Sequence, residues 1–179
     1  MHLQTHLTLS WAVGAWLKER RDRSLVAWAG VLPDLDGLSV LWGVDAFGRW
    51  HHVLTHSLVA ALVTTGLVLG VARDRARTAA LAFLAFHLHL GADLMGSGTG
   101  WSIAYLYPLS DWVVDGLDWW ELPSWQNVLI TAVALGFSCF MGVRFGRTFL
   151  EAWLPIRFDQ VFVKLLRRAF RRWAGDAAI

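Results

Sequence analysis

The sequence contains a single cysteine, Cys139, so an intramolecular disulfide cannot contribute to its stability. Charged residues are scarce as well, because Asp, Glu, Lys and Arg together make up 17% of the chain, against about 25% in an average soluble domain. Hydrophobic residues account for 56% of the 179 positions, and the mean hydropathy is +0.44. This composition disfavours a soluble domain and is typical of a membrane protein.

The N-terminus lacks the basic region with which a secretory signal peptide begins, and its first positive cluster, at residues 18–23, follows the first apolar stretch. That stretch also lacks a convincing small-residue cleavage site. We therefore expect it to be retained and not to be a removable signal peptide.

Five apolar segments can be marked, each near or a little below the roughly 20 residues that cross a bilayer. They cover residues 2–17, 24–44, 54–72, 78–95 and 127–143. In the second segment, Pro33 interrupts the helical hydrogen-bond ladder and Gly37 frees the backbone. The sequence therefore predicts an all-α, polytopic membrane bundle of about five apolar helices, the second of which is broken.

Lysine and arginine are absent from residues 97–127 but cluster at 18–23, at 73–77, after residue 143 and in the C-terminal tail. Under the positive-inside rule, this alternation predicts that the basic clusters face the cytoplasm and that the 97–127 loop lies outside. The N-terminus is then outside and the C-terminus inside. Because the basic residues border apolar segments, we expect no nucleic-acid partner, although the pI is about 9.1.

The pattern changes at Ile156, from which an amphipathic helix with one apolar and one basic face is predicted to run to Trp173. Such a helix should lie on the cytoplasmic membrane surface, where attraction to anionic lipid contributes roughly 1 kcal/mol per basic residue. The chain thus divides into a membrane-embedded helical domain, residues 1–150, and a basic amphipathic segment, residues 151–179. Membrane lipids are the expected partners of both.

Histidine is concentrated at the start of the third apolar segment. His51, His52 and His56 precede a run without charge, and imidazole is the commonest side-chain metal ligand. On the predicted topology, further polar residues of the apolar segments converge on the same outer side. These are His6 in the first segment, Asp34 and Asp36 in the break of the second, and His89 and Asp93, four residues apart on one helical face, in the fourth. His87 points away from His89 and is expected either to support a ligand from outside the site or to be a packing residue.

Nitrogen and oxygen donors without a thiolate suit zinc, manganese or iron at one or two sites. Two other interpretations stay open. The same residues could form a buried salt-bridge network in a non-catalytic membrane scaffold, or they could belong to a metal-handling or transport protein. Transport is less favoured, because the inner halves of the apolar segments contain almost no ionisable residue.

The order of these residues carries a resemblance to a known family. The motifs are Thr5-His6, Leu32-Pro33-Asp34-Leu35-Asp36, His51, Thr55-His56-Ser57, His89 followed by Asp93, and Tyr107-Pro108-Leu109. Over about residues 2–110 the chain resembles the YdjM-like family of membrane-bound metal-dependent hydrolases. The resemblance implies an all-helical protein of the bacterial inner membrane with a metal-dependent hydrolase activity of unnamed substrate. The residues that match the family's polar positions, and that we expect to bind metal, are His6, Asp34, Asp36, His51, His56, His89 and Asp93.

His52 departs from the family pattern, in which Arg or Lys is common at this position. It could add a ligand, or it could replace a cation that holds an anionic substrate. In a metal-dependent hydrolase we expect Asp34 or Asp36 to bridge metals or to act as general base, and His52 to protonate the leaving group. Because the predicted site opens at the outer membrane face beneath tryptophans, a lipid-linked or phosphate-bearing ester is the expected substrate.

Overall fold

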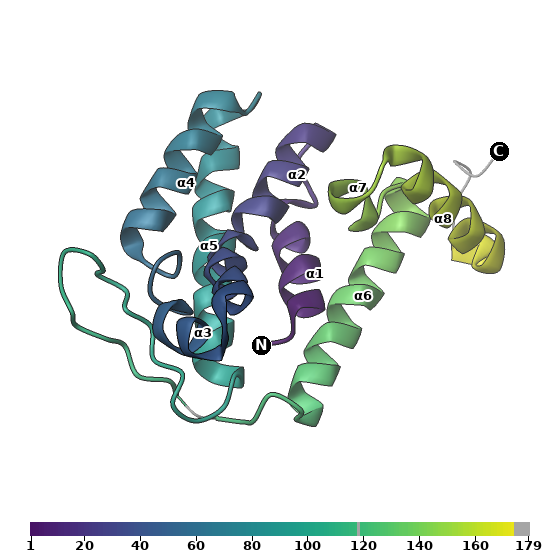
Figure 1. Cartoon of the computed structure of the whole chain (residues 1–179). Helices are drawn as coiled ribbons and strands as arrows, with labels where there is room; N and C mark the ends of the chain where they lie inside the picture. The colour runs from purple at the N-terminus through teal and green to yellow at the C-terminus, as the bar shows by residue number, and fades with distance from the viewer. Residues whose placement is uncertain (118, 174–179) are drawn as a thin grey trace.

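The computed structural model describes residues 1–117 and 119–173, which are largely helical (Figure 1). The elements are α1 (Leu3–Gly14), α2 (Arg20–Ala29), the 3-10 helix η1 (Leu32–Trp42), α3 (Val44–Trp50), α4 (Leu58–Val71), α5 (Arg75–Gly96), α6 (Trp125–Phe145), α7 (Leu150–Trp153), α8 (Ile156–Ala169) and the 3-10 helix η2 (Arg171–Trp173). Within the described residues, the only extended pairing is one antiparallel bridge between Ile103 and Val114, in the long loop before α6. The predicted all-α fold is confirmed. Residues 174–179 of the predicted C-terminal segment lie outside the described residues.

Two helices of the described chain, α5 and α6, are long and apolar enough to cross a membrane. As a pair, α2 and η1 pass the same test, but they bend by 51° at their junction, where the sequence predicts a broken helix. The apolar helix α4 is shorter, and α1 ends at Gly14. Two or three membrane spans are therefore supported, and the predicted number of about five apolar helices is not confirmed.

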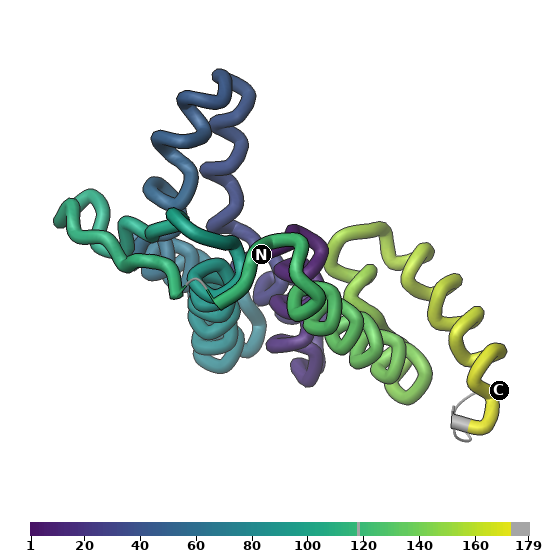
Figure 2. Tube along the Cα trace, turned by 90° about the horizontal axis from the view of Figure 1, so that it is seen from below, coloured from purple at the N-terminus to yellow at the C-terminus, as the bar shows by residue number. Residues whose placement is uncertain are grey.

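The helix α1 lies inside the bundle, in contact with α2, α5 and α6 (Figures 1 and 2). Small residues allow these helices to approach closely. A Cβ atom on Gly14 would lie 2.9 Å from Cβ of Val26, and one on Gly30 would lie 2.2 Å from Oγ of Ser10. This packing places His6, one turn before Ser10, beside the carboxyl-terminal half of α5.

A hairpin formed by η1 and α3 projects sideways from the bundle (Figure 2). The chain reverses at Gly43, whose φ of 109° favours glycine. The side chains around this turn are apolar and uncovered, since Leu41, Trp42 and Val44 are 76%, 78% and 80% exposed. An exposed apolar patch of this kind is typical of a surface that contacts a membrane or another protein.

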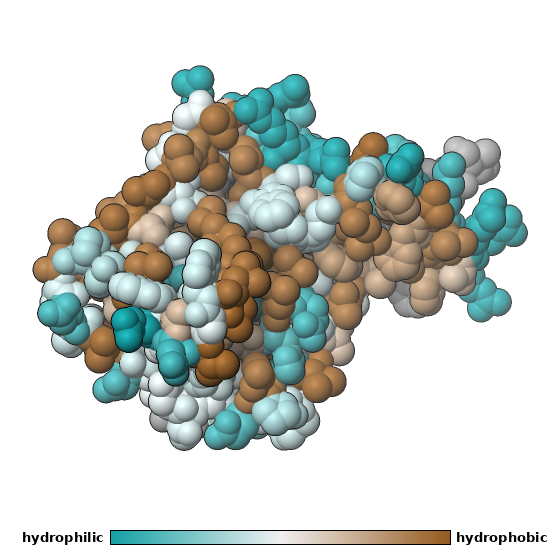
Figure 3. All heavy atoms as spheres, in the orientation of Figure 1, coloured by the Kyte–Doolittle hydropathy of each residue, from teal (hydrophilic) through white to brown (hydrophobic). Residues whose placement is uncertain are grey.

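Hydrophobic side chains cover much of the face seen in Figure 3, and hydrophilic ones gather at its upper end. That end holds the start of α2 and the turn between α4 and α5, where the basic residues of 18–23 and 73–77 lie (Figure 1). The loop before α6, which has no lysine or arginine, lies at the opposite end. The two ends of the bundle thus differ in charge as the sequence predicts, while the orientation of the termini stays a prediction.

A buried ion pair holds the short helix α7 against α1 and α2. Arg23 donates to both carboxylate oxygens of Glu151, at 2.5 and 2.7 Å, and Nε1 of Trp11 donates to the same carboxylate at 3.1 Å. Arg23 is 5% exposed and Glu151 is 1% exposed. Because water cannot hydrate either charge, each group depends on the other for compensation.

We predict that Glu151→Ala lowers the free energy of unfolding by about 3–5 kcal/mol, since it leaves the buried guanidinium of Arg23 unpaired. Arg73→Ala is the control, because Arg73 forms an exposed ion pair with Glu19 at 2.7 Å, and losing such a pair costs about 1 kcal/mol or less. Thermal unfolding of the detergent-solubilised protein, followed by circular dichroism, measures both variants. Equal melting temperatures would contradict the prediction.

Candidate metal centre

Four parts of the chain meet at one cluster of histidines and aspartates: α1, the start of η1, the connection between α3 and α4, and the carboxyl-terminal half of α5. All the candidate residues named from the sequence lie in this cluster. Their ligand atoms form three groups, and within each group the atoms lie within 4.8 Å of one another. The groups are His6, Asp34, His89 and Asp93; Asp36, His51 and His56; and His52, His56 and Asp93.

Asp93 lies at the centre of the cluster and belongs to two of the three groups. Its Oδ1 is 3.1 Å from Nε2 of His6, and its Oδ2 is 3.1 Å from Nε2 of His89. The same Oδ2 is 3.6 Å from Nε2 of His56 and 3.9 Å from Nε2 of His52. This carboxylate, 3% exposed, therefore lies close to four imidazoles, and it would be shared if both of its groups held a cation.

A backbone contact fixes the orientation of His89. Its Nδ1 donates to the carbonyl oxygen of Gly30 at 2.8 Å, since a carbonyl can only accept. The neutral ring then has its lone pair on Nε2, the atom that faces Asp93 at 3.1 Å and Asp34 at 3.6 Å. Metal-binding histidines are usually held in this way, with the second nitrogen bonded to a carbonyl or carboxylate.

Asp36 orients two histidines at once. Its Oδ1 accepts from Nδ1 of His51 at 2.8 Å, and its Oδ2 accepts from Nδ1 of His56 at 3.0 Å. Oδ2 also accepts from the amide of Thr55 at 3.2 Å, and the amide of Asp36 donates to Oγ1 of Thr55 at 3.1 Å. Because both oxygens of Asp36 are already used, the geometry favours an orienting role for this residue over a ligand role.

Several buried polar atoms of the cluster form no hydrogen bond within the described residues. They are Nε2 of His56, Nε2 of His89, Oδ2 of Asp34 and Nδ1 of His52. An unsatisfied buried polar group costs about 1–3 kcal/mol, so atoms of this kind need a partner. Imidazole nitrogens and carboxylate oxygens gathered in this way fit a divalent cation.

His51, His52 and His56 lie in the connection between α3 and α4 and not on a helix. The helix α4 begins at Leu58, where Oγ of Ser57 accepts from the amide of Ala60 at 3.2 Å and caps the helix. The helix predicted over 54–72 therefore starts later than expected. His52 and His56 reach the cluster from an irregular backbone, in which His52 has a φ of 69°.

The long loop before α6 holds this irregular connection in place. The amide of Ala104 donates to the carbonyl of His52 at 3.0 Å, and the amide of Leu58 donates to the carbonyl of Tyr105 at 2.7 Å. His87, expected to support a ligand from outside the site or to be a packing residue, contacts the carbonyl of Phe83 and the hydroxyl of Tyr105, each at 2.9 Å. It therefore belongs to the support of the loop and not to the cluster.

A cavity of about 240 Å³ opens beside the cluster. Its lining combines polar side chains, Asp34, His51, His52, Asp93 and Ser97, with Met1, Phe47, Trp101 and Leu122. The ring of His51 stacks on Phe47 with centroids 4.5 Å apart. The amino group of Met1 donates to Asp93 and, at 2.6 Å, to Oγ of Ser97.

Sequence reasoning missed the residues that support the cluster. The carbonyl of Gly30 carries no side-chain signal, and Phe47 is one apolar residue among many. Ser97 had a signal, because it follows Asp93 by four residues and its hydroxyl donates to that carboxylate at 3.1 Å. For Trp101, the only signal in the sequence was its position in a tryptophan-rich loop.

His56 and His52 lie outside the membrane-spanning segments, and their pKa values are shifted in opposite directions. Burial alone would lower the pKa of His56, but its hydrogen bond to Asp36 and the charges of Asp36 and Asp93 raise it to about 9. Burial is the larger cause and the charge of His56 the next one, and together they lower the pKa of His52 to about 3. At neutral pH, His52 is therefore uncharged, which suits a ligand better than the proton donor that the sequence predicts.

The sequence model of one protein family, described as YdjM inner membrane protein, matches residues 1–167. The match includes every residue of the cluster and extends beyond the stretch of about residues 2–110 on which the resemblance rests. No curated protein and no solved structure shows a significant match to the chain.

We predict that Asp36→Asn weakens metal binding about 10- to 100-fold, because an amide cannot orient both histidines as the carboxylate does. Asp45→Asn is the matched control, since it makes the same change at an exposed position of α3. Isothermal titration calorimetry with Zn²⁺ and with Mn²⁺ measures the affinities. If Asp36→Asn abolished binding as completely as Asp93→Asn, Asp36 would be a ligand.

Metal affinity should also rise with pH. A cation can bind Nε2 of His56 only after a proton leaves the ring, and the raised pKa of about 9 keeps that ring protonated at neutral pH. Below that pKa, this group should weaken binding by about tenfold for each unit by which the pH falls. Titrations in buffers of different ionisation enthalpy report the proton released. Binding that is independent of pH and releases no proton would exclude His56 as a ligand.

Proposed function

The chain belongs to the YdjM family of inner membrane proteins, and from this premise we propose that it is a metal-dependent hydrolase that works within the membrane. The observation that carries the proposal is the cluster itself. Ligand atoms from four parts of the chain converge around one buried carboxylate, and several of them form no hydrogen bond within the described residues. A purely structural network normally satisfies its own polar atoms, so the unsatisfied ones favour a cation over a salt-bridge scaffold.

Two of the three groups of ligand atoms are the proposed metal-binding sites. One consists of His6, Asp34, His89 and Asp93, and the other of His52, His56 and Asp93, so that Asp93 is shared. The donors suit zinc, manganese or iron. A divalent cation bound there would supply Lewis-acid activation of water and of the scissile bond.

Proton transfer is assigned to side chains that line the cavity. Asp34, with a side chain 26% exposed and one oxygen without a hydrogen bond in the described chain, is the proposed general base. Asp36 holds Nδ1 of His51, so Nε2 is the nitrogen turned away from that carboxylate. We assign protonation of the leaving group to His51, in place of His52, whose low pKa leaves it uncharged.

The cavity and the neighbouring hairpin fit an amphiphilic substrate. Asp34 and Asp93 form its polar wall, whereas Phe47 and Trp101 form an apolar wall. Phe47 belongs to α3, which together with η1 carries the exposed apolar tip around Trp42. A lipid tail could remain along this hairpin in the bilayer while a polar ester reaches the carboxylates. The proposed substrate is therefore a lipid-linked or phosphate-bearing ester.

The proposed orientation places this site near the outer face of the inner membrane. The end of the bundle that carries the basic clusters at 18–23 and 73–77 then faces the cytoplasm. The loop before α6, with Trp101 over the histidines, faces outward. In this orientation the C-terminal helix α8 lies on the cytoplasmic side.

We predict that His56→Ala and Asp93→Asn each reduce hydrolysis by about 100-fold or more, because each removes a donor of the proposed sites and Asp93 is shared by both. His87→Ala is the control, since His87 contacts Phe83 and Tyr105 outside the cluster. Hydrolysis of p-nitrophenyl phosphate and of a fluorescent phospholipid in mixed micelles measures the activity, with Zn²⁺, Mn²⁺ or Fe²⁺ and with chelator. Chelation should abolish turnover, and elemental analysis should find the metal in wild type.

Two results would contradict the proposal. One is a purified, folded protein that contains no stoichiometric metal and gains none on titration. The other is hydrolysis by His56→Ala and Asp93→Asn at the rate of wild type. In the first case, the cluster would be the salt-bridge network of a non-catalytic scaffold.

A further inference from the structure

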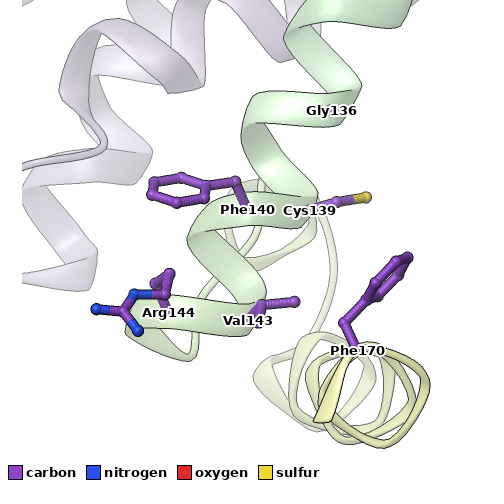
Figure 4. Close-up of a pocket in the computed structure, with 6 residues that line it drawn as sticks. All are labelled: Gly136, Cys139, Phe140, Val143, Arg144 and Phe170. Carbon is purple, nitrogen blue, oxygen red and sulfur yellow. The ribbon is translucent and has the colours of Figure 1, made fainter. Parts of the chain in front are cut away.

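An apolar cavity of about 430 Å³ lies between α6 and α8, and no residue of the metal centre lines it (Figure 4). Its lining residues are Gly136, Cys139, Phe140, Val143, Arg144 and Phe170. The volume falls within the range of about 300–1,000 Å³ that is usual for small-molecule sites. We call this cavity the α6–α8 groove.

The first part of α8 is fixed to the bundle, which leaves the groove beside its end. Asp159 accepts from the amide and the hydroxyl of Thr148, at 3.0 and 2.5 Å. Further along, α8 approaches α6 so closely that a Cβ atom on Gly142 would lie 2.8 Å from Cδ1 of Leu166. The two walls of the groove are therefore held in position by contacts outside it.

Beyond this close approach, the facing side chains leave a slot. Cys139 and Val143 project from α6 toward α8, and Phe170 projects from the end of α8 back toward Cys139 (Figure 4). At Gly136, an added Cβ atom would have no neighbour within 4 Å. From Val143 to Gly136 the slot follows α6 for about two helical turns, or about 10 Å.

A second cavity, of about 250 Å³, adjoins the groove at Phe170. Its lining residues are Ala169, Phe170, Arg171 and Arg172. Phe170 thus lies in the lining of both the apolar slot and a cavity whose lining includes the exposed residues Arg171 and Arg172. Among the residues that the structure describes, no acidic residue lines either cavity. The slot is mainly apolar, with Arg144 in its lining, and the adjoining cavity has two arginines in its lining.

We propose that the α6–α8 groove binds one acyl chain of an anionic phospholipid, whose phosphate is bound by Arg171 and Arg172. Guanidinium groups form paired, charge-assisted hydrogen bonds with phosphate oxygens. The walls are helices whose backbone groups bond within the helix, so they offer apolar contact to an acyl chain and no pairing to a peptide backbone. Because α6 is apolar enough to span the membrane, bilayer lipids reach the groove directly.

A site for one lipid differs from the diffuse attraction predicted for the basic face of α8. Diffuse attraction depends on how many basic residues lie near the membrane surface, whichever they are. A site depends on two particular arginines and on an open slot. Two pairs of matched variants separate these cases, and neither pair touches the metal centre.

The first pair tests the slot. Gly136→Trp fills the groove, and Gly66→Trp makes the same change on the exposed face of α4, where an added Cβ atom also meets nothing within 4 Å. Each protein is purified in mild detergent, incubated with equal amounts of phosphatidylglycerol and phosphatidylcholine, and examined by native mass spectrometry. We expect wild type and Gly66→Trp to retain one phosphatidylglycerol, and Gly136→Trp to retain about tenfold less.

The second pair tests the charge. The double variant Arg171→Gln, Arg172→Gln removes the proposed phosphate ligands, and Lys164→Gln, Arg168→Gln removes two charges from exposed positions of α8 itself. We expect the first double variant to lose the preference for phosphatidylglycerol over phosphatidylcholine and the second to keep it. The melting temperature of wild type should rise with phosphatidylglycerol, since a ligand of the folded state stabilises it.

Three outcomes would overturn the proposal. Equal retention by Gly136→Trp and Gly66→Trp would show that the slot holds no lipid. Equal losses in the two double variants would show only diffuse attraction to α8. Equal retention of phosphatidylcholine and phosphatidylglycerol by wild type would show that the arginines bind no phosphate group selectively.

Discussion

A carboxylate buried among histidines must be compensated within the protein, and the bundle is arranged around that requirement at Asp93. An isolated buried charge is strongly destabilising, whereas one that is surrounded by hydrogen-bond donors and positive charge can be retained. His6 of α1, His56 of the α3–α4 connection and His89 of α5 all face this one side chain. The geometry of the site and the packing of these segments therefore depend on each other, because moving any of the segments changes how the charge of Asp93 is compensated.

The close packing of α1 is related to the same requirement, that the charge of Asp93 be compensated within the protein. Gly14 and Gly30 bring α1 and α2 together at distances that a larger residue would prevent, and the bend after α2 turns η1 sideways from the bundle. The bend also frees the carbonyl of Gly30, which then accepts from His89. A regular helix through this region would have used that carbonyl within its own hydrogen-bond ladder. The interruption in the second apolar segment is thus what makes backbone available to orient a histidine.

Much of the site could be predicted from the sequence, because its members are rare polar residues in apolar surroundings. The four-residue spacing of His89 and Asp93 sets their shared face, and Pro33 indicates the break that holds Asp34. Other features depend on the tertiary structure and leave no local pattern, such as the carbonyl that accepts from His89. The number of membrane spans could not be predicted either, since an apolar segment such as 2–17 has the same sequence pattern whether protein or lipid covers it. The contacts of Asp36 with two histidines could be found only from the structure, because a carboxylate that binds a metal and one that orients a histidine are the same residue type in the same motif.

The double contact of Asp36 makes His51 and His56 a thermodynamically coupled pair. One carboxylate accepts from both rings, so a change in the protonation or position of one imidazole alters the hydrogen bond available to the other. The effects of substitutions at these two positions are then non-additive, and a double-mutant cycle between them has a coupling energy that depends on residue 36. A change at the His56 ring is accordingly communicated to the His51 ring, which lines the cavity, through two hydrogen bonds to one carboxylate.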